Sequence, residues 1–173
     1  AEVVILNQLK DIAPKIPIIS EENFTSHNLT ATDQFFLIDP LDGTREFLKK
    51  DGLGSFTVNI GRIENNIPTL GVVYAPALNR MFFASTLTGA FEHSNDLVKP
   101  ISIRELPKTG VIAVASVSHR DEATNKWLKN NNIKQTTSIG SSLKFCLVAC
   151  GEADVYPRFG PTMEWDTAAG HAI

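Results

Sequence analysis

Three β-rich segments follow one another in the first half of the chain, and they constrain the fold more than any other feature of the sequence. They cover residues 55–62, 69–74 and 80–84, and turn-forming residues separate them, first Asn65-Asn66 and then 76–79. Short connections of this kind join neighbouring antiparallel strands. The sequence therefore predicts an antiparallel meander, which favours α+β layers over a simple doubly wound sheet.

Further strands and helices are predicted on both sides of this meander. Short apolar runs predict strands, and apolar residues at helical spacing predict helices, the first of which ends at Pro14. The predicted strands cover residues 16–19, 35–38 and 111–116, and the predicted helices cover residues 4–12, 121–130, 141–150 and 165–173. With 173 residues the chain can bury a core, and we predict two subdomains, residues 1–107 and 108–173.

Composition excludes several classes of protein. A net charge of −3 and a pI of about 5.8 argue against a nucleic-acid polymer as partner, so an anionic substrate has to be attracted locally. Cys146 and Cys150, four positions apart, are predicted to be buried thiols on one side of a helix and not a zinc site. No apolar stretch is long enough to span a bilayer, and no signal peptide opens the chain. We therefore expect a soluble cytoplasmic protein without an integral membrane segment, and the sequence contains nothing that fixes its oligomeric state.

An acidic motif, Asp39-Pro-Leu-Asp42-Gly43, follows directly after one of the apolar runs. A tight turn there would aim both carboxylates at one point, and carboxylates that close usually share a cation. Oxygen ligands favour Mg²⁺, Mn²⁺ or Ca²⁺ over zinc. The alternative is that Asp-Pro and Asp-Gly are ordinary turn dipeptides and that Asp39 caps a short helix over 44–48. This motif alone leaves both interpretations open.

Two more acidic segments favour the metal interpretation. Ser20-Glu21-Glu22 follows another apolar run, and Trp165-Asp166 opens a predicted helix. Taken singly, each could be a solvated loop acid or a helix N-cap. Together, four carboxylates at strand ends and helix starts predict a metal site.

These motifs carry a resemblance to a known family. Asp39-Pro-Leu-Asp-Gly-Thr44 resembles the DPxDGT signature, and Trp165-Asp-Thr-Ala-Ala-Gly170 the WDxAAG signature, of the inositol monophosphatase superfamily, whose members are magnesium-dependent and lithium-sensitive phosphomonoesterases. Ser20-Glu21-Glu22 is similar to the third acidic element. Residues 56–60, 70–76, 135–146 and 156–161 look like the branch of bacterial 3′(2′),5′-bisphosphate nucleotidases of the CysQ type. The resemblance implies a layered α-β-α-β-α fold, here truncated at both ends.

The resemblance also implies a set of metal ligands. One Mg²⁺ is expected at Glu21, Asp39 and the backbone carbonyl of Leu41, and a second at Asp39, Asp42 and Asp166, with Asp39 as the bridge. Thr44, with Glu21 nearby, is expected to orient and deprotonate the attacking water. A third ion in this family depends on an upstream Asp element that this sequence lacks.

The same resemblance implies a substrate. Ser141, Lys144 and Arg158 match the residues with which nucleotidases contact the nucleotide and its distal phosphate, and His119 matches a position near the ribose and base. Gly43 and Thr44 are also expected to contact substrate. Taken singly, the two cations are more typical of a solvated surface. The alternative for His119 is a polar loop histidine without a ligand. Residues 139–142, opening a helix, are predicted to cradle a phosphate with free backbone N–H groups.

The expected reaction is hydrolysis of the 3′-phosphate of adenosine 3′,5′-bisphosphate to AMP and phosphate by metal-activated water. The sulfated relative 3′-phosphoadenylyl sulfate is an expected second substrate. Two alternatives remain open. A sister enzyme acting on an inositol phosphate or a sugar bisphosphate would keep all the acidic residues, and a non-catalytic protein would bind metal or phosphate without turnover. The CysQ resemblance also implies a tendency to associate peripherally with the inner membrane, although the sequence shows no basic amphipathic helix.

Overall fold

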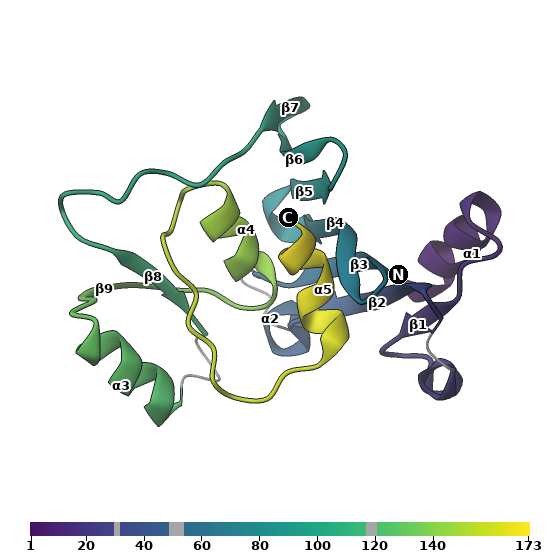
Figure 1. Cartoon of the computed structure of the whole chain (residues 1–173), viewed down its shortest axis with the longest axis horizontal. Helices are drawn as coiled ribbons and strands as arrows, with labels where there is room; N and C mark the ends of the chain where they lie inside the picture. Colours follow the sequence, from purple (N-terminus) through teal and green to yellow (C-terminus); the bar gives the residue numbers. More distant parts are fainter. Residues whose placement is uncertain (30–31, 49–53, 117–120) are drawn as a thin grey trace.

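The computed structural model describes residues 1–29, 32–48, 54–116 and 121–173 (Figure 1). The helices are α1 (Glu2–Ile12), α2 (Thr44–Leu48), α3 (Glu122–Asn130), α4 (Leu143–Ala149) and α5 (Glu164–Ala172), with 3₁₀ turns η1 (Phe24–Asn28) and η2 (Pro76–Leu78). The strands are β1 (Ile18–Ser20), β2 (Gln34–Asp42), β3 (Thr57–Glu64), β4 (Ile67–Ala75), β5 (Arg80–Ser85), β6 (Gly89–Ser94), β7 (Leu97–Pro100), β8 (Ile112–Ala115) and β9 (Gln135–Ser138).

The main sheet has seven strands in the order of the sequence, from β1 to β7. The first pair, β1 and β2, is parallel, and every later neighbour is antiparallel. The predicted meander over β3, β4 and β5 is therefore confirmed, and two further hairpin strands, β6 and β7, extend it. The mixed sheet with helices packed on it is the predicted α+β arrangement, and the subdomain boundary after residue 107 stays a prediction.

Helix α5 lies across β3 and β4 in the centre of the molecule (Figure 1). Two glycines permit this close contact. A Cβ atom on Gly71 would lie 2.2 Å from the carbonyl oxygen of Ala169, and one on Gly61 would lie 2.9 Å from the Cβ of Ala168. Because non-bonded heavy atoms do not approach so closely, the helix reaches the strands only where they carry no side chain. The first turn of α5 is thereby held against the sheet, next to β2.

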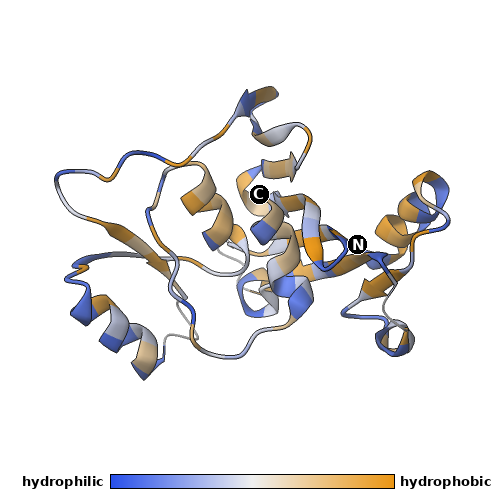
Figure 2. Cartoon of the chain, in the orientation of Figure 1, coloured by the Kyte–Doolittle hydropathy of each residue, from blue (hydrophilic) through white to orange (hydrophobic). Residues whose placement is uncertain are grey.

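Helix α4 packs between the main sheet and the smaller parallel pair β8 and β9. Its buried residues Leu143, Cys146 and Leu147 belong to the same core cluster as Phe82 and Val114. Figure 2 shows β8 hydrophobic along its length, whereas the outer turns of α3 are hydrophilic. The predicted burial of the thiols holds fully for Cys146 and partly for Cys150, and both cysteines are free.

At the other end of the sheet, α1 covers β2 by packing Leu9 against Phe36 and Ile38. These contacts fix β1 and β2 in parallel register, with Ser20 opposite Ile38. Glu21, directly after β1, and Asp39, the residue after Ile38 in β2, thus lie next to each other. In the part of the chain that the structure describes, no helix is long and apolar enough to cross a membrane.

Candidate active site

Three carboxylates from three elements converge beside the first turn of α5. Glu21 follows β1, Asp39 lies in β2 and Asp166 lies in the first turn of α5. One oxygen from each lies within 4.8 Å of one from each of the others. The sequence resemblance assigned Glu21 and Asp166 to two ions that share Asp39, and the structure brings the three carboxylates together.

Asp39 occupies the centre of this group and is 1% exposed. Its Oδ1 accepts a hydrogen bond from the Leu41 amide at 2.9 Å, and its carboxyl group is hydrogen bonded to that of Glu21. Burial, with the neighbouring charges of Asp42 and Glu21, raises the pKa of Asp39 to about 9. Burial also raises the pKa of Glu21. Carboxylates held this close without a counter-charge repel each other, so a donor set made only of carboxylate oxygens fits a hard divalent cation such as Mg²⁺.

Asp42 is not among the three carboxylates that meet within 4.8 Å, but its charge is close enough to raise the pKa of Asp39. The tight turn expected between Asp39 and Asp42 is wrong, because β2 stays extended through both residues with an irregularity in its pairing to β3. Asp39 pairs with Asn59 and Asp42 with Thr57, which lie two positions apart on one face of β3, so both carboxylates stay on the same face of the sheet. Oδ2 of Asp42 accepts the Ser142 N–H at 2.5 Å. Burial raises the pKa of Asp42 to about 6, and the Asp166 charge adds to this rise while the Ser142 bond opposes it.

Asp166 is positioned by its own helix and by an aromatic stack. Its Oδ2 accepts bonds from the Thr162 hydroxyl at 2.8 Å and the Met163 amide at 3.1 Å, which caps α5. The preceding Trp165 stacks on His27, with ring centroids 4.9 Å apart. His27 Nε2 also lies 2.9 Å from the Ser20 carbonyl oxygen. Sequence reasoning missed His27, because nothing in its local pattern indicates a partner so distant in the chain.

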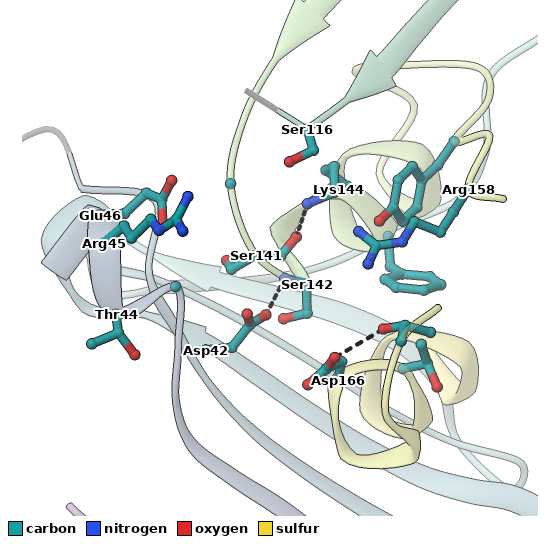
Figure 3. A pocket seen from close by; sticks show the side chains of 16 residues that line it. Asp42, Thr44, Arg45, Glu46, Ser116, Ser141, Ser142, Lys144, Arg158 and Asp166 are labelled. Carbon is teal, nitrogen blue, oxygen red and sulfur yellow. Dashed lines mark hydrogen bonds between the residues drawn. The ribbon is translucent and has the colours of Figure 1, made fainter. Parts of the chain in front are cut away.

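A pocket of about 460 Å³ opens next to this acidic group (Figure 3). Figure 3 shows Asp42 and Asp166 together on one side of it, and Lys144 and Arg158 on another. The lining residues are Asp42, Gly43, Thr44, Arg45, Glu46, Ser116, Gly140, Ser141, Ser142, Lys144, Phe145, Tyr156, Arg158, Thr162, Asp166 and Thr167. The predicted residues Gly43, Thr44, Ser141, Lys144 and Arg158 therefore share one cavity, whereas His119 lies outside the described residues.

Lys144 is the cation held most firmly in this pocket. It is 3% exposed, its Nζ donates to the Ser141 carbonyl, and it lies 5.2 Å from the centroid of the Tyr156 ring. Burial lowers its pKa to about 8, although the Asp42 charge opposes that shift. Arg158 donates to the Pro161 carbonyl at 2.8 Å, which directs its guanidinium group over the pocket (Figure 3).

The predicted cradle of free backbone N–H groups at residues 139–142 is wrong for three of its four amides, since the Ile139 amide already donates to the Ala115 carbonyl at 3.1 Å. The Gly140 amide donates to the Ser55 hydroxyl at 2.8 Å, and the Ser142 amide donates to Asp42. The Ser141 hydroxyl donates to the Ser55 carbonyl. These groups hold α4 against β2 and β3, so an anion in the pocket has to rely chiefly on side chains.

The site can now be compared with known proteins. The profile of the Inositol monophosphatase family matches residues 1–173, the whole chain. The chain belongs to the inositol monophosphatase family. Magnesium dependence is general in this family, in agreement with the carboxylate group described above.

Several characterised members are similar over the full chain. It is 48% identical over 174 residues to the 3′(2′),5′-bisphosphate nucleotidase CysQ of Salmonella typhimurium and 46% identical to that of Escherichia coli strain K12. In both cases the alignment covers 100% of this chain and 69% of the relative. The chain therefore spans about two thirds of the length of these inositol monophosphatase family members.

Comparison with solved structures agrees with this family assignment. CysQ from Bacteroides thetaiotaomicron superposes with a TM-score of 0.81 at 38% identity, over 98% of this chain and 67% of that one. SuhB of Mycobacterium tuberculosis superposes with a TM-score of 0.78 at 25% identity, over 98% of this chain and 67% of that one. The predicted layered fold of this family is thereby confirmed for the part of it that this chain spans.

Proposed function

We propose that the intact protein is a magnesium-dependent 3′(2′),5′-bisphosphate nucleotidase. It hydrolyses the 3′-phosphate of adenosine 3′,5′-bisphosphate to give AMP and phosphate, and accepts 3′-phosphoadenylyl sulfate as well. The observation that carries the proposal is one pocket with carboxylates on one side and two cations on another. Similarity to the CysQ nucleotidases over the whole of this chain, which is 69% of each relative, supports this choice of substrate.

In this reaction the acidic residues hold the metal and the cations hold the substrate. Glu21, Asp39, Asp166 and Asp42, with the Leu41 carbonyl, are the proposed ligands of two Mg²⁺ ions. Such ions lower the pKa of a bound water and neutralise charge on the leaving oxygen. A water molecule adds to phosphorus, the bond from phosphorus to the 3′-oxygen breaks, and that oxygen leaves with a proton.

Thr44 and Gly43 lie where the acidic side of the pocket meets α2. We propose that the Thr44 hydroxyl accepts a hydrogen bond from the attacking water and passes its own proton toward Glu21. Gly43 has a φ of +90°, a backbone conformation that a larger side chain rarely adopts. It therefore lets the chain turn from β2 into α2 while leaving room for the phosphoryl group.

Lys144 and Arg158 are proposed to bind the second phosphate, together with the Ser141 backbone, and His119 is proposed to lie near the ribose. Charge-assisted hydrogen bonds are among the strongest in proteins, and Arg can bind a phosphate with two parallel bonds. A substrate with a single phosphate offers these cations no second phosphate to bind. The pocket thus favours a bisphosphate over inositol 1-phosphate.

The test is phosphate release by the intact protein from adenosine 3′,5′-bisphosphate and from inositol 1-phosphate, with Mg²⁺ and with chelator. We expect metal-dependent release from the nucleotide, and a loss of about tenfold or more in kcat/KM in Lys144→Met. Lys126→Met, on the exposed side of α3, is the matched control and should behave as the parent. Preference for the inositol ester would assign the protein to the sister phosphatases, and release from neither would make it a non-catalytic binder.

A further inference from the structure

A ring of buried and half-buried hydrogen bonds joins Asp42 on β2 to the residue that precedes α4. Ser142 donates its N–H to Asp42 Oδ2 at 2.5 Å and its hydroxyl to Asn59 Oδ1 at 2.6 Å. The Asn59 amide group closes the ring by donating to the same Asp42 oxygen at 3.5 Å. Two segments 100 positions apart in the sequence are therefore tied at a single carboxylate oxygen.

Thr57 lies at the centre of this ring. Its hydroxyl oxygen is 2.7 Å from the Ser142 hydroxyl, 3.2 Å from the Ser141 hydroxyl and 3.4 Å from Asp42 Oδ2. A hydroxyl group has one proton to donate. Because Ser142 directs its proton to Asn59, the proton in the bond between Thr57 and Ser142 comes from Thr57. Thr57 thus orients Ser142, and Ser142 in turn orients Asp42.

Three of the four side chains in this group are shielded from solvent, whereas Asp42 is half-buried and lines the pocket. Thr57 and Asn59 are 0% exposed and Ser142 is 2% exposed. Alternation along β3 places Thr57 and Asn59 on the same face of the sheet, two positions apart. A buried polar network is rigid when every group in it is paired, and loss of one partner leaves the others buried and unpaired. Loss of the Thr57 hydroxyl would therefore leave the buried Ser142 hydroxyl with one partner fewer.

We propose that Thr57 is a positioning residue that couples the acidic side of the pocket to its cationic side. Through Ser142 it fixes the direction of the Asp42 carboxylate, and through the same residue it fixes the start of α4, which carries Ser141 and Lys144. The distance between bound cation and bound distal phosphate then stays matched to one substrate. This inference rests on the proposed function, because it concerns how that site keeps its geometry.

Two substitutions at Thr57 separate positioning from packing. Thr57→Val keeps the shape and removes the hydroxyl, whereas Thr57→Ser keeps the hydroxyl and removes a buried methyl group. In the intact protein we expect Thr57→Val to lower kcat for the bisphosphate about tenfold and to raise the Mg²⁺ concentration for half-maximal rate about fivefold. Thr57→Ser should stay within about twofold of the parent on both measures, although its core is packed less well than that of Thr57→Val. Thr69→Val on β4 is the control for replacing Thr by Val in a strand outside this ring.

A second readout does not depend on turnover. Calorimetric titration of Mg²⁺ alone should show about fivefold weaker binding to Thr57→Val and to Ser142→Ala than to the parent. If the parent releases no phosphate from the nucleotide, the proposed function fails, and this titration still decides the inference. Parent-like Mg²⁺ binding in both variants, or an activity that follows melting temperature so that Thr57→Ser is the more impaired, would overturn it.

Discussion

Replacing Asp39 with Asn should stabilise the metal-free protein at neutral pH while abolishing its activity. Folding raises the pKa of this carboxyl group from an ordinary 3.8 to about 9, so between these values the folded state binds more protons than the unfolded state. The free energy of unfolding therefore falls as pH rises through this range. pH 7 lies about three pH units above the ordinary pKa, and each unit lowers the free energy of unfolding by about 1.4 kcal/mol. Asn therefore removes a destabilisation of the folded state of at most about 4 kcal/mol. This is an upper limit because Glu21 takes up part of the same charge repulsion.

The assay is thermal unfolding in chelator at pH 5.5, 7 and 8.5, with and without Mg²⁺. Asp39→Asn keeps an oxygen that can accept the Leu41 amide, so the variant loses the charge and retains the hydrogen bond. In chelator, the melting temperature of the variant should exceed that of the parent by a margin that grows with pH. Added Mg²⁺ should raise the melting temperature of the parent and leave that of the variant unchanged. Asp33→Asn replaces an exposed acid, so it should change neither the melting temperature in chelator nor the effect of Mg²⁺ on it. An Asp39→Asn protein that melts at or below the parent at pH 8.5 in chelator would refute the reasoning.

Two further predictions concern the cationic side of the pocket and the aromatic stack. Because burial lowers the pKa of Lys144 to about 8, the side chain loses its charge as pH rises through that value, and KM for the bisphosphate should rise up to about tenfold per pH unit above it. Steady-state kinetics should show a flat KM in Lys144→Arg, and a flat KM in the parent would contradict the assignment. His27→Ala removes a ring stack of about 1 kcal/mol beside the acidic group, so Mg²⁺ binding should weaken about fivefold. Fluorescence of Trp165 in a Trp127→Phe background measures this binding, His27→Phe should restore most of it, and unchanged affinity in His27→Ala would contradict the prediction.

The sequence predicted the convergence of Glu21, Asp39 and Asp166 because each carboxylate follows or opens an element with a clear apolar pattern. It did not predict the extended path of β2 through Asp42, because that path depends on pairing with β3 and Asp-Pro is locally typical of a turn. Local rules describe what a segment prefers by itself, and a neighbouring strand can override that preference.

The start of α4 gives a second example of the same limit. Gly-Ser-Ser before a helix is typical of an anion cradle, but the amides of Gly140 and Ser142 are taken by Ser55 and Asp42. These partners are 85 and 100 positions away, so only the folded chain identifies them. The helices themselves were predictable, since their periodicity is local and strong over α1 and α3.

The two glycines beneath α5 bear on how this protein can change during evolution. With Gly61 and Gly71 opposite Ala168 and Ala169, the helix rests on the main chain of the strands, and no side chain acts as a spacer between them. Exchanges among Val, Ile and Leu elsewhere in the core alter side-chain volumes and leave this contact unchanged. Substitutions elsewhere in the core therefore leave the distance between Asp166 and the carboxylates of β2 unchanged. Relatives with different core residues can retain the same metal-binding geometry.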